Sequence, residues 1–414
     1  MILNKNFDLI VVGGGAAGIM SAIISARDGK SVLLLEKLPK IASKLKATGG
    51  GRCNLTNTLS NEEFMAKFGR DGRFMQDALG AFDHKALIGF FKDIGVETHA
   101  PDGFRIFPTS HSSSTIISAL EDELRTLHVE VLCSQKVQKL LHVEDKIVGI
   151  ETPSDTFYAS NVVVATGGLG YPTLGAQGDG YEMAQELGHK TTELYPAMMP
   201  LKTKDEWVKN CRADTIAKAE LRVDLKKHNK LRATGDLIFT SNGIRGPVVL
   251  DFAREITPLL SKYGELSILA NLTKGMNEEQ LNQHLKKEVE TNPHAEILKH
   301  ICTLLPEALS LALLDLAGID PKSKYGKISG SSKAKLINIL AWTPLTINGH
   351  DGFKMAMITR GGINLKEINP RTMQSKLIDG LYFCGEVMNL DGPCGGYNLQ
   401  WSFASGYLAG LLKK

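Results

Sequence analysis

Cysteine is scarce in this sequence of 414 residues, and neither sign of charge is in marked excess. The six cysteines are scattered along the chain: Cys53, Cys133, Cys211, Cys302, Cys384 and Cys394. They form no C-x-x-C pair and no spacing typical of metal ligands. A long chain with so few cysteines is typical of a reduced, cytosolic protein. The 48 Lys and Arg against 45 Asp and Glu give a net charge of +3, which neither requires nor excludes an anionic partner.

One uncharged run, Leu9–Ala26, reaches eighteen residues, the lower limit for a membrane-spanning helix or a long signal sequence. It contains four glycines, three of them consecutive, and neither a basic cluster nor an A-x-A cleavage site accompanies it. We therefore expect no membrane association and a cytoplasmic location. The sequence also shows no P-loop, no Ser/His/Asp triad and no cluster of metal ligands, so we expect no metal site.

The composition is that of a globular protein. Hydrophobic residues make up 43% of the chain and charged residues 22%, which excludes a disordered or collagen-like protein. The length suggests two or three domains. The 41 glycines exceed the usual share of about 7%. They gather in a few clusters, which indicate where backbone passes close to a ligand.

The first glycine cluster has the G-x-G-x-x-G pattern of a dinucleotide site. The apolar run Phe7–Val12, typical of a buried strand, leads directly into Gly13, Gly15 and Gly18. The first glycine permits a tight turn, the second lets backbone approach a pyrophosphate, and the third lets the next helix pack on the strand. A helix over residues 17–28 would point its N-terminal amides at the phosphates.

A carboxylate stands where such a site needs one. The second apolar run, Ser31–Leu35, ends in Glu36, eighteen residues after Gly18. A carboxylate at this position accepts hydrogen bonds from ribose hydroxyls, and it would repel a 2′-phosphate. The sequence therefore predicts a βαβ dinucleotide site that does not take NADP.

Three further glycine clusters indicate which dinucleotide binds. Asn161–Gly168 has the pattern of a strand and a small-residue turn, Thr48–Asn54 follows Glu36 closely, and Gly380–Gln400 lies near the C-terminus. Backbone must therefore approach the ligand from both ends of the chain. A long cofactor such as FAD needs this, whereas an NAD-binding fold usually closes within its first half. No second G-x-G-x-x-G appears, so NADH or NADPH, if used, would bind transiently over the flavin.

Four runs stand in order along the chain: Thr48–Asn54, Gly103–Pro108, Ile358–Ile363 and Gly385–Gln400. Together they resemble the YhiN/BaiN-like bacterial flavoproteins, within the glutathione-reductase-type FAD superfamily, and the resemblance covers essentially the whole chain. Two positions depart from the family's pattern. Asn389 stands where the family usually has an acidic residue. This difference affects the hydrogen bonds that the resemblance implies on the flavin side. Arg245 replaces a small residue, which suggests a substrate pocket that differs from its relatives.

We predict an α/β fold with a split, Rossmann-like FAD-binding domain over residues 1–195 and 347–414. The insert between them, 196–346, has short strand-like patterns to about residue 272 and a helical pattern over residues 277–316. The resemblance implies a small β-barrel in this insert with a helical subdomain at about 274–327.

The motifs and the resemblance together give the candidate FAD-binding residues. They are Gly13, Gly15, Ala16, Ala17, Gly18, Glu36, Lys37, Lys44, Thr48, Gly49, Gly50, Gly51, Arg52, Cys53, Asn54, Val137, Thr166, Gly167, Gly168, Gly385, Glu386, Asp391, Gly395, Gly396, Tyr397, Asn398 and Leu399. The final helix, which begins near Asn398, would place its positive end at the flavin N1/C2=O edge. There it would stabilise the negative charge of reduced flavin.

Three residues of the flavin-side loops are candidates for catalysis. Cys53 or Tyr397 could supply a proton while flavin N5 supplies hydride, and Arg52 could stabilise charge. The alternative is that Cys53, and Cys394 in a similar loop, are small buried side chains that only pack against their neighbours. Arg245 could meet an anionic substrate or form a structural salt bridge.

The insert is more basic than the rest of the chain. Between Lys202 and Arg232, ten Lys and Arg oppose five acidic residues, and Lys322–Lys335 adds five more lysines. Basic segments of this kind usually lie on solvent-exposed faces that bind no ligand. The alternative is a phosphate-binding surface around the flavin site.

These observations leave three functions open. The first is an FAD-dependent oxidoreductase for a small molecule, because the resembled family is associated with amine oxidation and with reduction of conjugated C=C bonds. The second is reduction of uridine to dihydrouridine in ribosomal RNA, with the basic insert contacting phosphates. The third is a non-catalytic flavin redox sensor, although no effector domain is evident. The sequence does not predict the substrate, the electron donor or the oligomeric state.

Overall fold

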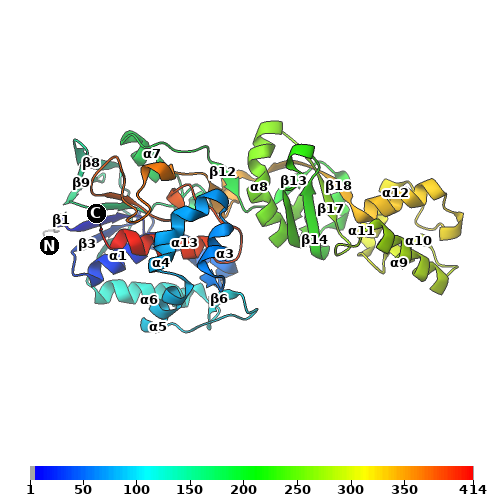
Figure 1. The fold of residues 1–414 in the computed structure, drawn as a ribbon, viewed down its shortest axis with the longest axis horizontal. Helices are drawn as coiled ribbons and strands as arrows, with labels where there is room; N and C mark the ends of the chain where they lie inside the picture. Colours follow the sequence, from blue (N-terminus) through cyan, green and yellow to red (C-terminus); the bar gives the residue numbers. More distant parts are fainter. Residues whose placement is uncertain (1–4, 414) are drawn as a thin grey trace. The chain divides into compact units, whose positions relative to one another are not determined.

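The computed structural model describes residues 5–413, which form two compact units (Figure 1). The first unit contains the residues up to Pro196 together with those from Met357 onward, and the second is Ala197–Ala356. Each unit has its own cluster of buried hydrophobic side chains.

A five-stranded sheet forms the centre of the first unit, and every neighbouring pair of its strands is parallel. In spatial order the strands are β20 (Leu381–Phe383), β11 (Val162–Val164), β2 (Leu9–Val12), β3 (Val32–Leu35) and β7 (Glu130–Leu132). The middle strands are fully buried apolar runs, as expected for a parallel sheet that is covered on both faces. Because β20 pairs with β11, the two ends of the chain share one sheet.

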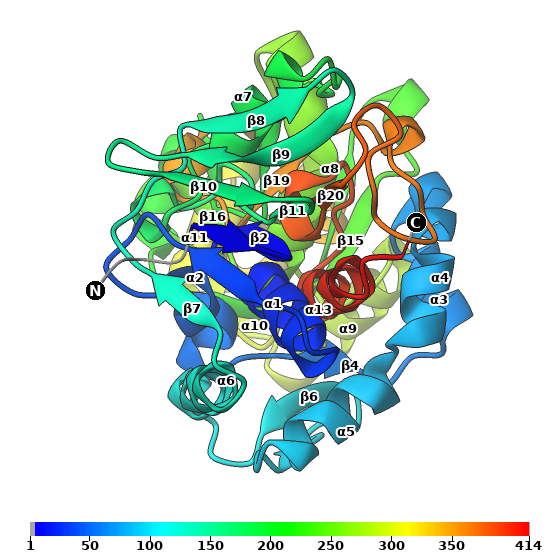
Figure 2. The ribbon, with the colours of Figure 1, turned by 90° about the vertical axis from the view of Figure 1, so that its left-hand side faces the viewer.

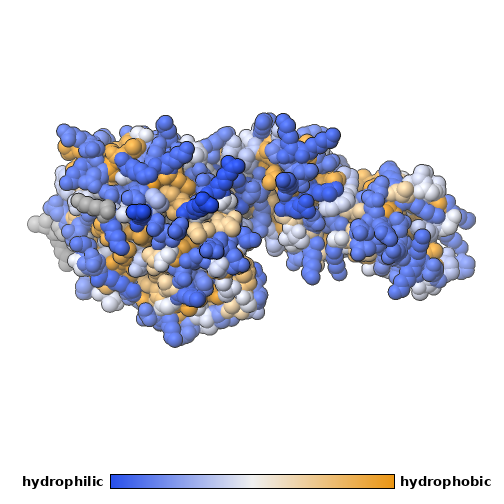
Figure 3. All heavy atoms as spheres, viewed as in Figure 1, coloured by the Kyte–Doolittle hydropathy of each residue, from blue (hydrophilic) through white to orange (hydrophobic). Residues whose placement is uncertain are grey.

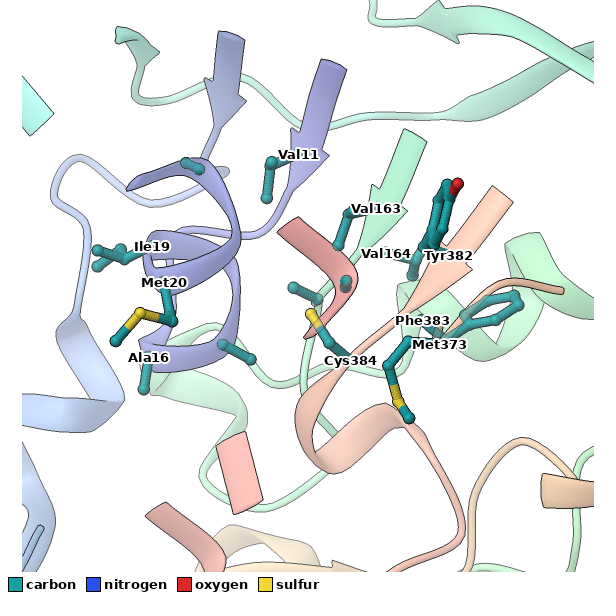
Figure 4. Close-up of a cluster of buried hydrophobic side chains, with 14 of the residues drawn as sticks. Val11, Ala16, Ile19, Met20, Val163, Val164, Met373, Tyr382, Phe383 and Cys384 are labelled. Atoms are coloured by element: carbon teal, nitrogen blue, oxygen red, sulfur yellow. The ribbon is translucent and has the colours of Figure 1, made fainter. Parts of the chain in front are cut away.

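Helices α1 (Ala16–Arg27), α6 (Ser113–Thr126) and α13 (Tyr397–Gly410) lie along one face of this sheet (Figure 2). A second sheet lies beyond the other face, in the order β1 (Asn6–Phe7), β10 (Thr156–Ala159), β9 (Lys146–Glu151) and β8 (Lys139–Val143). Apolar side chains of α1 and of the strands, among them Ile19, Met20 and Val163, belong to one buried cluster (Figure 4).

The remaining elements of the first unit are short. A three-stranded sheet has the order β4 (Thr56–Asn57), β6 (Arg105–Pro108) and β5 (Thr98–His99). The other helices are α2 (Ser43–Ala47), α3 (Asn61–Ala66), α4 (Gln76–Ala81), α5 (His84–Asp93) and α7 (Asp179–Glu186).

The second unit contains a closed antiparallel barrel of six strands. Around the barrel they are β13 (Leu201–Thr203), β16 (Gly243–Arg245), β15 (Arg232–Phe239), β14 (Thr215–Val223), β17 (Leu266–Asn271) and β18 (Thr343–His350). Buried and accessible residues alternate along β17 and β18, as the pleat of a barrel requires. On the face drawn in Figure 3, hydrophilic residues cover most of the barrel. The predicted α/β fold, with a Rossmann-type sheet and an inserted β-barrel, is confirmed.

Helix α8 (Pro247–Tyr263) was not predicted, because the sequence analysis assigned only strand-like patterns to this part of the insert. Pro258 lies inside the helix and is unfavourable there, since proline lacks the amide that an α-helix uses. Packing outweighs this cost, because Val249, Phe252 and Ile256 are buried on one face.

The helical part of the insert continues beyond the expected residue 327. It contains α9 (Glu278–Thr291), α10 (Ile297–Ile301), α11 (Glu307–Ala317) and α12 (Gly330–Ala341). Helix α12 begins at a Ser329 cap, whose hydroxyl accepts a hydrogen bond from the Ser332 amide at 3.1 Å. Residue 347, where a return to the first domain was expected, falls inside β18, and the second unit ends at Ala356.

Among the residues that the structure describes, every helix is too short or too polar to cross a bilayer. The uncharged run Leu9–Ala26 forms strand β2 and most of helix α1.

Candidate functional site

The glycine turn between β2 and α1 has two positions where a side chain would collide with backbone. Gly13 has φ +107°, and a Cβ there would lie 2.6 Å from Ala165 O. A Cβ on Gly18 would lie 2.0 Å from Gly13 O. Glycine is therefore required at both positions to bring α1 close to β2 and β11.

Gly15 differs, because a Cβ on it would meet no atom of a non-neighbouring residue within 4 Å in the described chain. Helix α1 begins next to it, and no side chain among residues 5–413 caps the helix. Its first turn also contains no acidic residue. The unpaired amides of a helix start beside open space are suited to an anion such as a pyrophosphate.

Glu36 lies at the end of β3 and is held by two backbone amides. Its Oε2 accepts a hydrogen bond from Gly14 N and its Oε1 accepts one from Leu38 N, both at 2.9 Å. Each carboxylate oxygen has capacity for a further hydrogen bond. The fixed carboxylate can therefore accept from ribose hydroxyls beside the glycine turn.

Lys37 forms an ion pair with Asp179 at the start of α7, and Lys136 binds the same carboxylate at 2.9 Å. Burial acts to raise the pKa of Asp179, but the hydrogen bonds from the two lysines lower it overall. Val137, next in the chain, is buried. Lys37 thus links the end of β3 to the start of α7, and the carboxylate of Asp179 neutralises its positive charge.

Lys44 and Glu386 join segments from opposite ends of the chain. Lys44 Nζ lies 2.7 Å from Glu386 Oε2, and Thr359 N donates to Glu386 Oε1 at 2.9 Å. Nearby, a Cβ on Gly168 would lie 2.8 Å from Glu386 Oε1. The Thr166 hydroxyl is buried and has no hydrogen-bond partner among residues 5–413. This hydroxyl lies against Gly180 of α7, where a Cβ would be 2.1 Å from it.

The loop Thr48–Asn54 is built on left-handed backbone. Gly49, Gly50 and Gly51 have φ values of +58°, +67° and +87°. With its side-chain nitrogen facing Thr56 O, Asn54 accepts a hydrogen bond from Gly396 N at 3.0 Å. This bond ties the N-terminal loop to the C-terminal turn.

The C-terminal turn is fixed by further hydrogen bonds. Asn57 Nδ2 donates to Gly395 O at 2.9 Å, and Asn398 Oδ1 accepts from Gly392 N at 2.8 Å. Helix α13 begins at Tyr397 after Gly396, and no side chain among residues 5–413 caps it. Its first turn lacks acidic residues, so a second helix start is available to stabilise negative charge.

These features fit an extended dinucleotide. Two uncapped helix starts and a fixed carboxylate are the groups that would hold pyrophosphate, ribose and a flavin edge. The hydrogen bonds of Asn54 and Asn57 join the Thr48 loop to the Gly395–Gly396 turn, and a Cβ on Gly385 would lie 2.9 Å from the Ala17 Cβ in the first turn of α1. The sequence analysis did not select Thr359 and Asp179, although Thr359 lies in a run it quoted.

The three catalytic candidates have very different surroundings. Cys53 is fully buried, and burial raises its pKa to about 12, with a hydrogen bond to Thr48 offsetting part of the effect. Tyr397 is also buried, and its ring centroid lies 4.9 Å from that of Phe64 and 6.2 Å from that of Phe68. These positions favour packing roles for both, whereas Arg52 is exposed.

Arg245 lies at the end of β16 in the barrel, where it is exposed. No ion pair of Arg245 occurs within residues 5–413. No group of three or more potential metal ligands occurs in the described chain.

Known proteins match nearly the whole chain. The HI0933-like protein Rossmann domain family matches residues 7–412. The chain belongs to this family. The predicted membership of a YhiN/BaiN-like flavoprotein group is thereby confirmed.

This HI0933-like protein is 32% identical over 402 residues to the 3-dehydro-bile acid delta(4,6)-reductase of Clostridium scindens, and 97% of each chain is covered. It is 29% identical over 406 residues to the ribosomal RNA dihydrouridine synthase of Haemophilus influenzae, again with 97% of each chain covered. In fold it resembles the 3-ketosteroid delta1-dehydrogenase from Sterolibacterium denitrificans, with a TM-score of 0.56, 13% identity and 99% of each chain covered. The HI0933-like protein is an FAD-dependent oxidoreductase.

Proposed function

We propose that this protein reduces a carbon–carbon double bond conjugated to a carbonyl group in a small molecule. The observation that carries this proposal is the similarity, over 97% of both chains, to a delta(4,6)-reductase of a 3-dehydro-bile acid. A 3-oxo group beside such double bonds makes a conjugated enone. We assign the reaction to the site formed by the glycine turn after β2 and by the two flavin-side loops, which contain Cys53 and Cys394.

Bound FAD supplies hydride transfer to the substrate. The protein binds and orients it. The helix start at Ala16 holds the pyrophosphate, and Glu36 holds ribose hydroxyls, since its two oxygens are fixed by Gly14 and Leu38. The start of α13 would stabilise the flavin edge that becomes negative on reduction, and the Asn54 hydrogen bond holds the Thr48–Asn54 loop against the Gly396 turn.

NADH or NADPH is the proposed electron donor. The central sheet of the first unit has one G-x-G-x-x-G turn, and that turn serves FAD. Reduced nicotinamide would then bind transiently, exchanging with the substrate at the flavin.

An anaerobic half-reaction experiment tests the proposal. FAD-loaded protein is reduced with NADH or NADPH and mixed with cyclic enones and a 3-oxo-Δ4 steroid, and flavin absorbance and product mass are followed. We expect reoxidation of the flavin with a product two hydrogens heavier than the enone. The proposal is wrong if no enone reoxidises the flavin, and reduction of the flavin by small amines would instead indicate an amine oxidase.

Reduction of uridine in ribosomal RNA is the second candidate, and a charge distribution favours it. The second unit contains 23 Lys and Arg against 18 Asp and Glu, although the whole chain has a net charge of only +3. At the hairpin between β14 and β15, Lys226, Lys227 and Lys230 are exposed. None of the three forms an ion pair in the part of the chain that the structure describes. Such a hairpin is suited to phosphate contacts.

The salt dependence of RNA binding tests this second function. We expect a K226E/K227E/K230E variant to lose affinity for a ribosomal RNA fragment and to show a shallower dependence on salt, because each phosphate contact contributes about 0.7–0.9 to the slope. The matched control is K322E/K324E/K327E, which changes three exposed lysines of the same unit. Equal losses in both triple variants would indicate general charge attraction without a defined docking surface.

The cellular test is nucleoside mass spectrometry of ribosomal RNA from a strain lacking the protein. Loss of dihydrouridine, restored by the wild-type gene but not by the hairpin variant, would establish the RNA function. An unchanged profile would leave the small-molecule enone as substrate.

A further inference from the structure

Arg52 is the exposed member of the three catalytic candidates, and its surroundings assign it a role. Resting on the proposed enone reduction, we infer that Arg52 binds the carbonyl oxygen of the substrate and stabilises the negative charge that develops there. It would thereby select substrates with an oxygen beside the double bond.

The guanidinium of Arg52 is oriented by two contacts. Its Nε donates a hydrogen bond to Gly49 O at 3.2 Å, which closes the glycine turn that precedes it. Its central carbon lies 5.3 Å from the centroid of the Phe107 ring. Contact with the face of an aromatic ring favours one orientation of the planar guanidinium group. The group is thus positioned while its terminal nitrogens keep their donors.

The charge of Arg52 has no counter-ion within residues 5–413, and no further hydrogen bond of its side chain occurs there. Arg105 provides the contrast, because its guanidinium lies 5.8 Å from the same Phe107 ring. Arg105 Nε lies 2.6 Å from Asp102 Oδ2, and hydrogen bonds from Arg105 lower the pKa of Asp102 to about 2. Of the two arginines on this ring, Arg52 alone keeps an uncompensated charge in the described chain.

The loop beside Arg52 leaves room for a ligand. A Cβ on Gly50 or on Gly51 would meet no non-neighbouring atom of the described chain within 4 Å. The Asn54 hydrogen bond to Gly396 fixes the far end of this loop. Arg52 therefore stands at the open side of the Thr48–Asn54 loop, which the sequence analysis expects on the flavin side.

Reduction of an enone needs a positive group beside the carbonyl oxygen of the substrate. The β-carbon of the enone accepts a hydride with its electron pair, and the π electrons of the double bond move through the α-carbon onto the carbonyl oxygen. The resulting enolate then takes a proton from solvent at the α-carbon, which gives the saturated ketone. A fixed guanidinium stabilises the enolate oxygen without giving up a proton itself, because arginine stays protonated.

A phenol serves as the probe, because a phenolate resembles an enolate in charge and geometry. 4-Chlorophenol is titrated into FAD-loaded protein, and the long-wavelength charge-transfer absorbance of the bound phenolate is measured as a function of pH. We expect binding to the wild type, with R52Q weaker by about tenfold or more, the usual loss for a hydrogen bond to a charged group. R52K should lose less, because it keeps the charge without the planar fork.

The control is R105Q, which alters the other arginine on Phe107 and should bind the phenolate as the wild type does. Flavin content and circular dichroism of each variant show whether FAD and fold are retained. Absence of phenolate binding by the wild type, wild-type affinity in R52Q, or an equal loss in R105Q each overturns the inference. If phenolate binding depends on Arg52 while no enone is reduced, the oxygen-binding role stands and the proposed function fails.

Discussion

At the scale of single residues, the glycines of the first turn share a motif but differ in what surrounds them. A side chain on Gly18 would collide with Gly13 O at 2.0 Å, whereas one on Gly15 would enter open space. Gly15 also has φ −85°, which any residue adopts easily. Gly18 is therefore needed to build the turn, and Gly15 is needed to leave room for a ligand.

We predict opposite defects in G15V and G18A. G15V should fold with an unfolding temperature close to that of the wild-type apoprotein but retain no FAD, because the side chain fills the pyrophosphate space. G18A should lose about 1–3 kcal/mol of stability from overpacking against Gly13 O. Flavin absorbance after purification and thermal unfolding of the apoproteins measure the two effects. A fully loaded, yellow G15V would contradict the assigned pyrophosphate site.

Cys53 gives a second prediction at this scale. Burial raises its pKa to about 12 and its side chain is inaccessible, so the thiol stays neutral across the physiological pH range. Because the thiolate is the reactive form, Cys53 should become reactive only as the pH approaches 12. In native protein at pH 8, we expect iodoacetamide to label exposed Cys302 and to leave Cys53 unmodified, as peptide mass spectrometry can show.

The matching functional experiment is C53A. Turnover of the variant should stay within about twofold of the wild type, since its role is packing. A pH-independent loss of turnover with flavin retained would instead support the catalytic thiol.

At the scale of elements, α1 and α13 approach closely through small residues. A Cβ on Gly406 would lie 2.3 Å from Ala17 O, and one on Gly410 would lie 2.5 Å from Ser21 O. The four-residue spacing puts both glycines on the face of α13 that meets α1. This contact places the last turns of α13 beside the first turns of α1, so the final helix packs against the first (Figure 2).

We predict that G406A destabilises the protein by about 1–3 kcal/mol, because the added methyl group has no space between the helices. The control is G80A in α4, where the same methyl group would meet no non-neighbouring atom of the described chain within 4 Å. G80A should instead stabilise by about 0.4–1 kcal/mol through helix propensity. Denaturant unfolding of both variants checks the signs. A destabilised G80A together with a neutral G406A would contradict this account of the contact.

The sequence predicted elements well where local pattern and packing agree. The strands β2, β3 and β11 are apolar runs, and each was expected. Helix α8 was missed because Pro258 opposes helix formation locally, while burial of its apolar face favours it. Helix α12 was missed, because it lies beyond the expected end of the helical subdomain and its start is set by the Ser329 cap.

Contacts between distant segments could not be predicted from the sequence. The pairing of Lys44 with Glu386 and of Lys37 with Asp179 joins residues separated by 342 and 142 positions. Motifs select residues for their own backbone geometry, so they found Gly13 and Glu36. They contain no information on which distant residue neutralises a lysine or donates to a carboxylate, so Asp179 and Thr359 were not selected.

At the scale of the whole molecule, the two units have separate hydrophobic cores. The proposed FAD contacts all lie in the first unit, from Gly13 to Leu399. A ligand stabilises the structure to which it binds, by about 2.7 kcal/mol at a concentration one hundred times its dissociation constant. FAD should therefore stabilise the first unit and leave the core of the second unchanged.

Tryptophan fluorescence can separate the two cores. Trp401 is buried in the first unit, and Trp207 and Trp342 lie in the second, so W401F reports on the second unit alone. In thermal unfolding we expect release of flavin fluorescence to shift upward as the FAD concentration rises, while the tryptophan transition of W401F stays at one temperature. A matched W207F/W342F variant, which keeps Trp401, should follow the flavin transition. If every probe shifts together with FAD, the two cores unfold as one cooperative structure, and the insert takes part in stabilising the cofactor site.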